Sequence, residues 1–159
     1  MRSLEKISFE QFCKDICDNK KLYDEYNLPC RSTIKSAGYD FELLKDIVLK
    51  PKEIIKIPTG IKVKMNDDEI FMLIIRSSLG FKYNLRLTNQ IGIIDSDYYN
   101  NISNEGHMWI SIQNEGEETI SLKKGTKIIQ GIFVKYLTVD NEEQVITERT
   151  GWTVLKEEE

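Results

Sequence analysis

The stretch Ile54-Ile55-Lys56-Ile57-Pro58-Thr59-Gly60-Ile61-Lys62-Val63-Lys64-Met65 contains two runs in which apolar residues alternate with lysine. Alternation with a period of two is typical of strands that bury one face, because successive side chains point to opposite sides of a strand. Pro58-Thr59-Gly60 separates the two runs and consists of residues that favour a turn. The stretch therefore predicts two consecutive strands joined by a tight turn.

Similar runs continue along the chain. Apolar segments bounded by clusters of turn residues predict further strands at 70–75, 85–94, 108–112, 119–122 and 128–137. No helical period separates these segments, so the pattern favours a sandwich, a jelly roll or a small barrel over a parallel α/β sheet. Gly92 lies inside the 85–94 run, where a glycine often marks a bulge or the close approach of a ligand. We expect one all-β domain.

The segment before Pro29 has a different period. Ser8 and Gln11 are spaced as in a capping box, and apolar residues between Phe9 and Cys17 recur at intervals of three and four. This predicts one short amphipathic helix that ends near Asp18. The chain thus divides into an N-terminal helical extension (1–27), a β domain (28–140) and a C-terminal arm (141–159).

Composition excludes several classes of function. With 159 residues, 40% hydrophobic and 30% charged, the chain can bury a core and is not a disordered protein. A net charge of −4 argues against binding a nucleic-acid backbone, although a few local cations can still hold a small anion. Charges interrupt every apolar run before the roughly 20 residues that a membrane helix needs. The N-terminus lacks the apolar segment of a signal peptide, so we expect a cytoplasmic protein with no membrane partner.

The segment Ile93-Ile94-Asp95-Ser96-Asp97-Tyr98 contains the strongest candidate for catalysis. Two carboxylates two residues apart on a strand point to the same side and perturb each other's titration. Because they follow an apolar run, partial desolvation of one of them would make it a general base. The alternative interpretation is a turn at the end of a strand, in which Asp97 caps a backbone N–H.

Other segments offer groups that bind phosphate. Arg76-Ser77-Ser78-Leu79-Gly80 follows the strand at 70–75, and a guanidinium beside two hydroxyls can bind phosphate oxygens. The alternative is a solvated Ser-Ser turn. Gln130 falls in an apolar strand, where it needs a polar partner from the backbone or a ligand. Asp40 ends the segment 36–40 (Ser-Ala-Gly-Tyr-Asp) and can hold a metal-bound water. His107 is expected to be an ordinary loop residue.

Five segments in this order resemble the motifs of the trimeric dUTPase family, the deoxyuridine triphosphate nucleotidohydrolases. The resemblance runs from about Leu28 to Tyr136. The matching motifs are residues 36–40 (SAGYD), 58–60 (PTG), 76–80 (RSSLG), 87–98 (LTNQIGIIDSDY) and 125–133 (GTKIIQGIF).

The resemblance implies a jelly-roll subunit of a homotrimer whose active sites are each assembled from all three chains. The implied reaction is hydrolysis of dUTP to dUMP and pyrophosphate with Mg²⁺ bound by the triphosphate. Asp95 would activate the attacking water, and Tyr98 would pack on the deoxyribose and exclude a 2′-hydroxyl. The uracil edge would be read by Asn89 and by the strand backbone at Gly92 and Ile94.

The remaining roles that the resemblance implies concern the triphosphate. Arg76, Ser77 and Ser78 would line the phosphate path, Gln130 would bind an α-phosphate oxygen, and Asp40 would reach Mg²⁺ through water. In the family, the third motif comes from a subunit that neighbours the one supplying the first, second and fourth motifs.

Two features depart from the family pattern. The loop Tyr99 to His107 is longer than in the shortest members. The last motif, commonly Arg-x-x-Gly-Gly-Phe-Gly-Ser-Thr-Gly, here reads Arg149-Thr150-Gly151-Trp152-Thr153 and then becomes acidic. Arg149 and Gly151 match, and Trp152 is placed to stack on uracil in place of the phenylalanine. This arm leaves open the alternative of a nucleotide-binding regulator with weak catalysis. A second alternative is a relative of dCTP deaminase, an enzyme that shares the fold.

Overall fold

Antiparallel β-strands make up most of the computed structural model, which describes residues 1–145 and 147–151. The strands are β1 (Ser3–Lys6), β2 (Cys30–Arg31), β3 (Tyr39–Glu42), β4 (Ile47–Leu49), β5 (Ile54–Pro58), β6 (Ile61–Lys64), β7 (Glu69–Ile75), β8 (Leu85–Leu87), β9 (Gly92–Asp95), β10 (Trp109–Asn114), β11 (Ile120–Leu122) and β12 (Lys127–Lys135). The helices are α1 (Phe9–Asp15), α2 (Lys20–Glu25), α3 (Ser77–Tyr83) and a 3-10 turn, η1 (Ser96–Tyr98). The expected all-β fold is confirmed.

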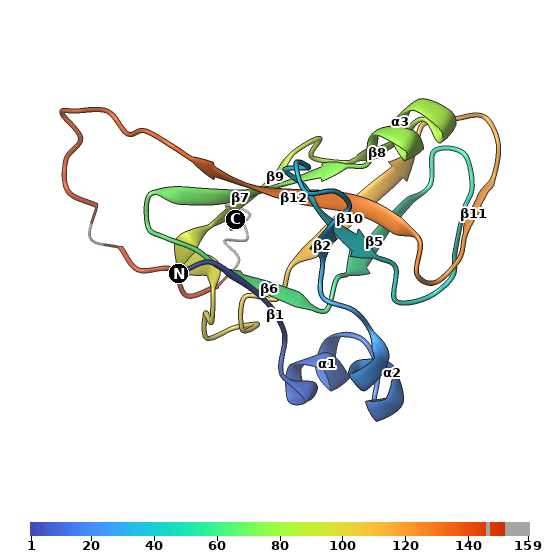
Figure 1. The fold of residues 1–159 in the computed structure, drawn as a ribbon, viewed down its shortest axis with the longest axis horizontal. Helices are drawn as coiled ribbons and strands as arrows, with labels where there is room; N and C mark the ends of the chain where they lie inside the picture. The colour runs from blue at the N-terminus through green and yellow to red at the C-terminus, as the bar shows by residue number, and fades with distance from the viewer. Residues whose placement is uncertain (146, 152–159) are drawn as a thin grey trace, which may run out of the picture.

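The largest sheet has the strand order β2-β3-β12-β7-β9 and positions most of the motifs (Figure 1). A second sheet has the order β5-β10-β8, and β1 pairs with β6 and β11 with β4. In the large sheet β12 pairs with β7 along seven residues, from Ile129 opposite Ile75 to Lys135 opposite Glu69. The non-sequential strand order means that segments far apart in the chain lie side by side, as in a jelly roll.

The two strands expected on either side of Pro58-Thr59-Gly60 are present as β5 and β6. Gly60 has a φ of +75°, a conformation that glycine adopts without strain and that this turn requires. One expected strand, 85–94, is instead two strands, β8 and β9. Gln90, with a φ of +64°, reverses the chain between them, and Gly92 begins β9 instead of interrupting a strand.

The expectation of a single helix is wrong in two places. α1 ends at Asp15, and Asn19 caps a second helix, α2, by accepting a hydrogen bond from the N–H of Leu22. In the β domain, the segment that follows Arg76 forms α3. Both helices are short and lack a long apolar stripe, so a periodicity argument does not detect them.

The N-terminal segment packs into the same core as the β domain. Ser8 caps α1 as expected, but the Gln11 side chain bonds Asp15 and does not complete the capping box. Phe12 is fully buried and stacks with Tyr26 at 5.8 Å between ring centroids. β1, which the sequence pattern did not predict, adds a strand beside β6 (Figure 1). No helix in residues 1–145 or 147–151 is long and apolar enough to cross a bilayer.

The core position of Phe12 gives a test of this packing. Replacing Phe12 with Ala leaves a cavity, and we expect the free energy of unfolding to fall by about 3–5 kcal/mol in a denaturant titration. Phe81 on α3 is 93% exposed and supplies the matched control. Phe81→Ala should change the free energy of unfolding by less than about 0.5 kcal/mol. Equal effects of the two substitutions would contradict a core that extends to the N-terminus.

Candidate active site

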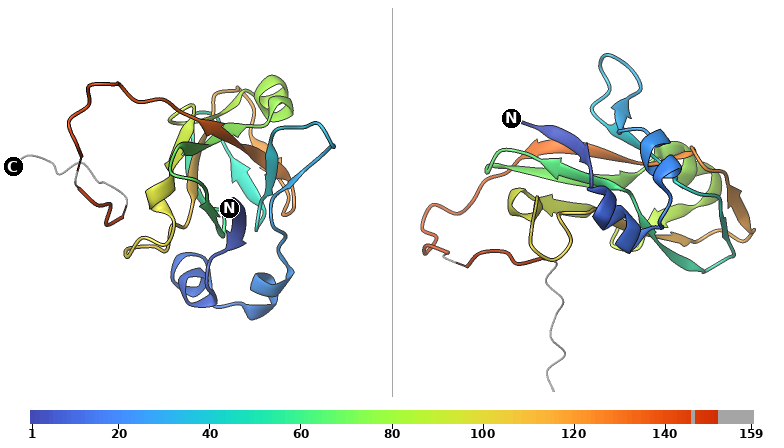
Figure 2. Two further views of the ribbon diagram at one scale, coloured as in Figure 1. Left: turned by 60° about the vertical axis from the view of Figure 1, so that its left-hand side comes forward. Right: turned by 90° about the horizontal axis from the view of Figure 1, so that it is seen from below.

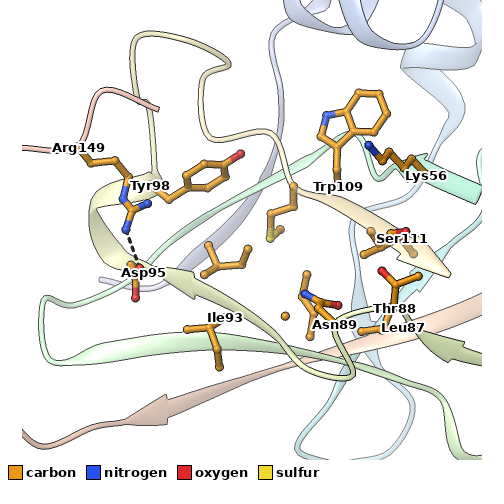
Figure 3. A pocket seen from close by; sticks show the side chains of 15 residues that line it. Lys56, Leu87, Thr88, Asn89, Ile93, Asp95, Tyr98, Trp109, Ser111 and Arg149 are labelled. Carbon is orange, nitrogen blue, oxygen red and sulfur yellow. Dashed lines mark hydrogen bonds and ion pairs between the residues drawn. The ribbon is translucent and has the colours of Figure 1, made fainter. Parts of the chain in front are cut away.

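A cavity of about 470 Å³ opens between β9 and β10 and contains many of the residues singled out from the sequence (Figure 3). Asp95, Tyr98 and Arg149 line one end, and Lys56 and Trp109 line the other. The walls between them are formed by Leu73, Leu87, Thr88, Asn89, Gly92, Ile93, Ile94, Met108, Ile110 and Ser111. An apolar cleft with a few polar groups at its ends is typical of a site for a small organic ligand.

The turn between β8 and β9 shapes the middle of the cavity. The N–H of Thr88 donates to the carbonyl of Ser111, and the N–H of Gln90 donates to the carbonyl of Leu87. Asn89 thus lies at an exposed tip with its side chain free to meet a ligand edge (Figure 3). Gly92 packs closely on Leu73 of β7, since a Cβ added there would lie 3.2 Å from the Leu73 Cβ.

Two carboxylates at the end of β9 bind one cation. Asp95 ends the strand, whereas Asp97 lies in η1, so the two do not continue one strand as expected. Arg149 nevertheless bridges them, with its Nη2 2.7 Å from Asp95 and its Nε 2.6 Å from Asp97. The side chains of Asp95 and Asp97 are 50% and 56% exposed, so each carboxylate is partly covered and still accessible to solvent. The hydrogen bond to Asp97 raises the pKa of Arg149, which keeps the guanidinium charged.

The C-terminal arm reaches this end of the cavity through a second contact. Gly151 is buried against Ser103, in the loop that departs from the family pattern, and a Cβ at Gly151 would overlap the Ser103 side chain. The arm thus runs out from β12 and returns to the segment after β9 (Figure 2). Trp152, the residue expected to stack on a base, lies outside the described residues.

The remaining predicted residues form a second cluster around Asp40. This carboxylate is 5% exposed and accepts a hydrogen bond from Ser32. Arg76 Nε lies 3.2 Å from one of its oxygens, and Lys127 Nζ lies 3.7 Å from the other. Two cations around one carboxylate leave a net positive charge at the surface, which suits an anionic ligand. Lys127 was not singled out from the sequence, because a lysine at the start of a strand carries no signal of its own.

Gln130 and the start of α3 complete this cluster. Gln130 lies opposite Asp40 in the pairing of β12 with β3. Gly38 packs directly on it, since a Cβ at Gly38 would lie 2.2 Å from Gln130 Oε1. Ser77 and Ser78 are exposed in the first turn of α3. Three of the sequence motifs, 36–40, 76–80 and 125–133, therefore meet in one place, which we call the phosphate cluster.

The phosphate cluster and the cavity lie at opposite ends of β7. Asp95 pairs with Ile70 near the start of this strand, whereas Arg76 follows its last residue. Six residues at about 3.4 Å each separate these positions, a distance of about 20 Å. None of Asp40, Arg76, Ser77, Ser78 and Gln130 lines the cavity in the described part of the chain. One chain therefore does not bring Asp95 and Arg76 to the same phosphate group.

His107 lies in a loop, as expected, but it is fully buried, which its sequence context did not indicate. Its ring bonds Asp15 of α1 and the backbone N–H of Gly60. Sequence spacing gave no sign of these contacts, because their partners lie 92 and 47 residues away. Burial lowers the pKa of His107 and therefore favours the neutral ring. The hydrogen bond to Asp15 and its charge act in the opposite direction.

Comparison with known proteins agrees with the motifs. The sequence model of the dUTPase family matches residues 24–153. The deoxyuridine 5′-triphosphate nucleotidohydrolase of Lactococcus lactis is 44% identical over 126 residues, which cover 79% of this chain and 84% of that protein. The corresponding enzyme of Shewanella piezotolerans is 35% identical over 73% of this chain and 74% of that protein.

Solved structures give the same result. The crystal structure of the Streptococcus mutans dUTPase has a TM-score of 0.70 and 33% identity, covering 87% of this chain and 99% of that one. A mutant dUTPase from phage phi11 of Staphylococcus aureus, described with a structural Mg(II) ion, has a TM-score of 0.66 over 92% of this chain and 97% of that one. Its 20% identity supports a likeness of fold alone.

The bridge made by Arg149 gives a test of how the arm is held. Glu142 and Glu143 lie exposed in the arm, so a glutamate-specific protease reports on its opening. Exposed ion pairs contribute about 0.2–1 kcal/mol each, and we expect Arg149→Ala to accelerate cleavage about 3- to 10-fold. Wild type in 1 M NaCl should show the same acceleration, because salt screens exposed charges.

A matched control is Arg31→Ala, which removes a guanidinium that donates to the carbonyls of Ile34 and Ser36 in a different loop. Its cleavage rate in the arm should equal that of wild type. Equal rates for wild type and Arg149→Ala would show that the ion pairs do not hold the arm.

Proposed function

Because the chain belongs to the dUTPase family, we propose that it hydrolyses dUTP to dUMP and pyrophosphate, with its active sites shared between the subunits of a homotrimer. Such a reaction limits the incorporation of uracil into DNA and supplies dUMP. The observation that carries the shared site is the separation of about 20 Å between Asp95 and Arg76 along β7. A second copy can bring its phosphate cluster to the cavity of the first.

Asp95 is the proposed catalytic residue. Its carboxylate is half exposed at the mouth of the cavity, where an attacking water can reach it. It would orient this water in line with the α-phosphorus and accept its proton. Arg149 donates a hydrogen bond to this carboxylate. A triphosphate would offer the Arg149 guanidinium another anionic partner.

The cavity supplies selectivity for the nucleoside. Asn89 can exchange hydrogen bonds with the uracil edge, and the backbone at Gly92 and Ile94 offers further donors and acceptors. The ring of Tyr98 lies in the wall beside Asp95, where it would pack on the deoxyribose and clash with a 2′-hydroxyl. The role proposed for Trp152 is to stack on the uracil base.

The phosphate cluster of the neighbouring subunit would bind the triphosphate. Arg76 can bind two phosphate oxygens at once, and the hydroxyls of Ser77 and Ser78 can each donate one bond. Gln130 would donate its amide to an α-phosphate oxygen. Lys127 adds a second cation within reach of the same carboxylate as Arg76 and increases the positive potential.

The donor set fits a magnesium ion that the triphosphate itself carries. Among the described residues no group of three or more His, Cys, Asp or Glu side chains could hold a metal. Mg²⁺ commonly keeps several waters and binds one or two carboxylates together with substrate phosphates. When bound, it would neutralise charge on the phosphates, and Asp40, whose oxygens already face two cations, would contact it through water.

Neither of the two alternatives gains support. No relative described above is a deaminase, and the features that matched, Asp95 and Tyr98 at one cavity, are those of the hydrolase motif. A regulator without catalysis would have to bind dUTP and release no pyrophosphate, which the following measurement tests directly.

The first prediction of this proposal concerns the proposed base. Wild type should release pyrophosphate from dUTP in the presence of Mg²⁺, and Asp95→Asn should reduce kcat by about 10²- to 10⁴-fold, the usual contribution of a general base. Affinity for a non-hydrolysable dUTP analogue should persist in the variant. If both proteins bind the analogue and neither releases pyrophosphate, the proposal of catalysis is wrong.

The second prediction concerns the shared site. Asp95→Asn and Arg76→Ala chains should each be inactive, but unfolding them together and refolding the mixture should restore about a quarter of wild-type activity. A site is intact when one chain supplies Asp95 and its neighbour supplies Arg76, which happens in one of four random combinations. Gln130→Ala replaces Arg76→Ala if the latter does not fold.

Mixing the two variants after separate folding is the control and should restore nothing. A refolded mixture that stays inactive, or a wild-type protein that sediments as a monomer, would contradict a site shared between subunits.

A further inference from the structure

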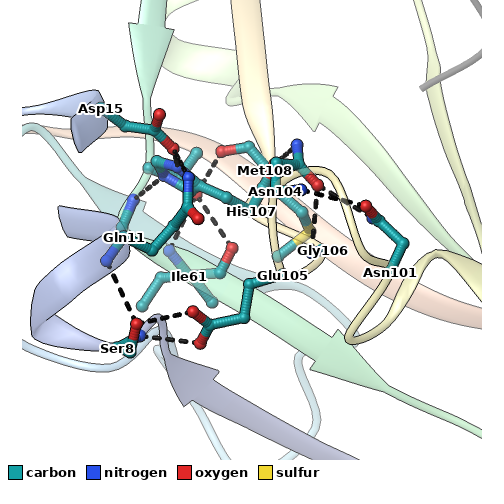
Figure 4. Close-up of polar contacts among 12 residues, drawn as sticks. Ser8, Gln11, Asp15, Ile61, Asn101, Asn104, Glu105, Gly106, His107 and Met108 are labelled. Carbon is teal, nitrogen blue, oxygen red and sulfur yellow. Dashed lines mark hydrogen bonds and ion pairs between the residues drawn. The ribbon is translucent and has the colours of Figure 1, made fainter. Parts of the chain in front are cut away.

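The hydroxyl of Tyr98 is held by the long loop that follows it. It donates to the carbonyl of His107 at 3.1 Å and accepts from Nδ2 of Asn104 at 2.7 Å. Both partners lie within residues 99–107, the loop that is longer than in the shortest family members (Figure 4). The Tyr98 ring therefore has a fixed wall position, although the 3-10 turn that bears it is only three residues long.

The amide of Asn104 has only one orientation that satisfies its neighbours. Its Oδ1 accepts from Nδ2 of Asn101 at 2.8 Å and from the N–H of Gly106 at 3.1 Å. Its Nδ2 must then face the Tyr98 hydroxyl, because the oxygen already serves two donors. Asn101 is 7% exposed, and its own Oδ1 accepts from the N–H groups of Ser103 and Asn104. The network is thus fixed on both sides of the amide.

The end of the loop is anchored to the N-terminal segment. His107 Nε2 accepts from the N–H of Gly60 at 2.8 Å, so the proton of the neutral ring is on Nδ1, which donates to Asp15 at 2.5 Å. Glu105 accepts from both the N–H and the hydroxyl of Ser8, at 2.8 and 2.6 Å (Figure 4). These contacts hold the carbonyl of His107 in place beneath the Tyr98 hydroxyl.

We propose that Asn104 is a positioning residue, which fixes the ring of Tyr98 and thereby sets how strongly the site prefers a deoxyribonucleotide to a ribonucleotide. The inference rests on the proposed function, since it assigns the Tyr98 ring to the sugar. Steric exclusion of the 2′-hydroxyl requires that the Tyr98 ring stay in place. A displacement of the ring by about 1 Å is enough to weaken the exclusion. Burial raises the pKa of Tyr98, so the hydroxyl stays protonated and able to donate.

The test compares kcat/KM for dUTP and for UTP in wild type, Asn104→Ala, Tyr98→Phe and the double variant. We expect Asn104→Ala to lower the preference for dUTP about fivefold, which corresponds to one hydrogen bond of about 1 kcal/mol. In the Tyr98→Phe background the same substitution should have no further effect, because the hydroxyl through which Asn104 acts is gone.

Ile102, which is 88% exposed at the tip of the same loop, supplies the matched control. Ile102→Ala should keep the wild-type preference. An unchanged preference in Asn104→Ala would overturn the inference, as would an equal loss in the presence and absence of the Tyr98 hydroxyl, which would indicate a general effect on the loop. If Asn104→Ala does not fold, Tyr98→Phe alone should show the fivefold loss, and an unchanged preference would overturn the inference.

Failure of the proposed function gives a different result. If wild type releases no pyrophosphate, the same variants are compared by calorimetry with the α,β-imido analogues of dUTP and UTP. A preference for the deoxy analogue that Asn104→Ala weakens supports the inference without catalysis. A wild-type protein that binds both analogues equally overturns it.

Discussion

The pairing of β12 with β7 is the interaction on which the rest of the molecule depends. It spans the centre of the large sheet, and each end of β7 positions one half of the chemistry. At the far end the N–H of Arg76 donates to the carbonyl of Ile128, which places the guanidinium beside Asp40. At the near end β9 adds to the same strand and ends at Asp95. A slip of one residue in this register would turn every side chain to the opposite face and separate both halves.

Much of the strand pattern was predictable because burial on one face leaves a period of two in the sequence. The strand pattern did not predict the turn within 85–94, the helix α3 or the strand β1. The run 85–94 has apolar residues at both ends and the polar residues Thr88, Asn89 and Gln90 between them, and it is divided at Gln90, whose φ is positive. α3 follows Arg76 without a capping side chain, and β1 contains a single apolar residue, Leu4. Such elements form because a neighbouring strand or core surface is present, and this is not visible in their own residues.

The candidate site was predictable as a set of motifs and not as a set of contacts. The acidic pair and the Arg-Ser-Ser segment are local patterns, so their residue types already indicate chemistry. Lys127 beside Asp40 and Arg149 on Asp95 join positions 87 and 54 residues apart. Sequence spacing carries no information on pairs so distant. The same holds for Asn104, whose proposed role follows from the hydrogen bond that its amide donates to the Tyr98 hydroxyl.

The N-terminal segment and the loop at 99–107 share their polar groups. Glu105 is bound by Ser8 and Lys62, and the ring of His107 depends on Asp15 for one of its two hydrogen bonds. Removing the segment alone would leave a buried imidazole with an unmet donor and expose the apolar surface beneath Phe12. Removing the loop alone would take the His107 ring from Asp15 and leave it the amide of Gln11 as a partner. In evolution, and in any chimera with a shorter relative, the two pieces must therefore be gained or lost together.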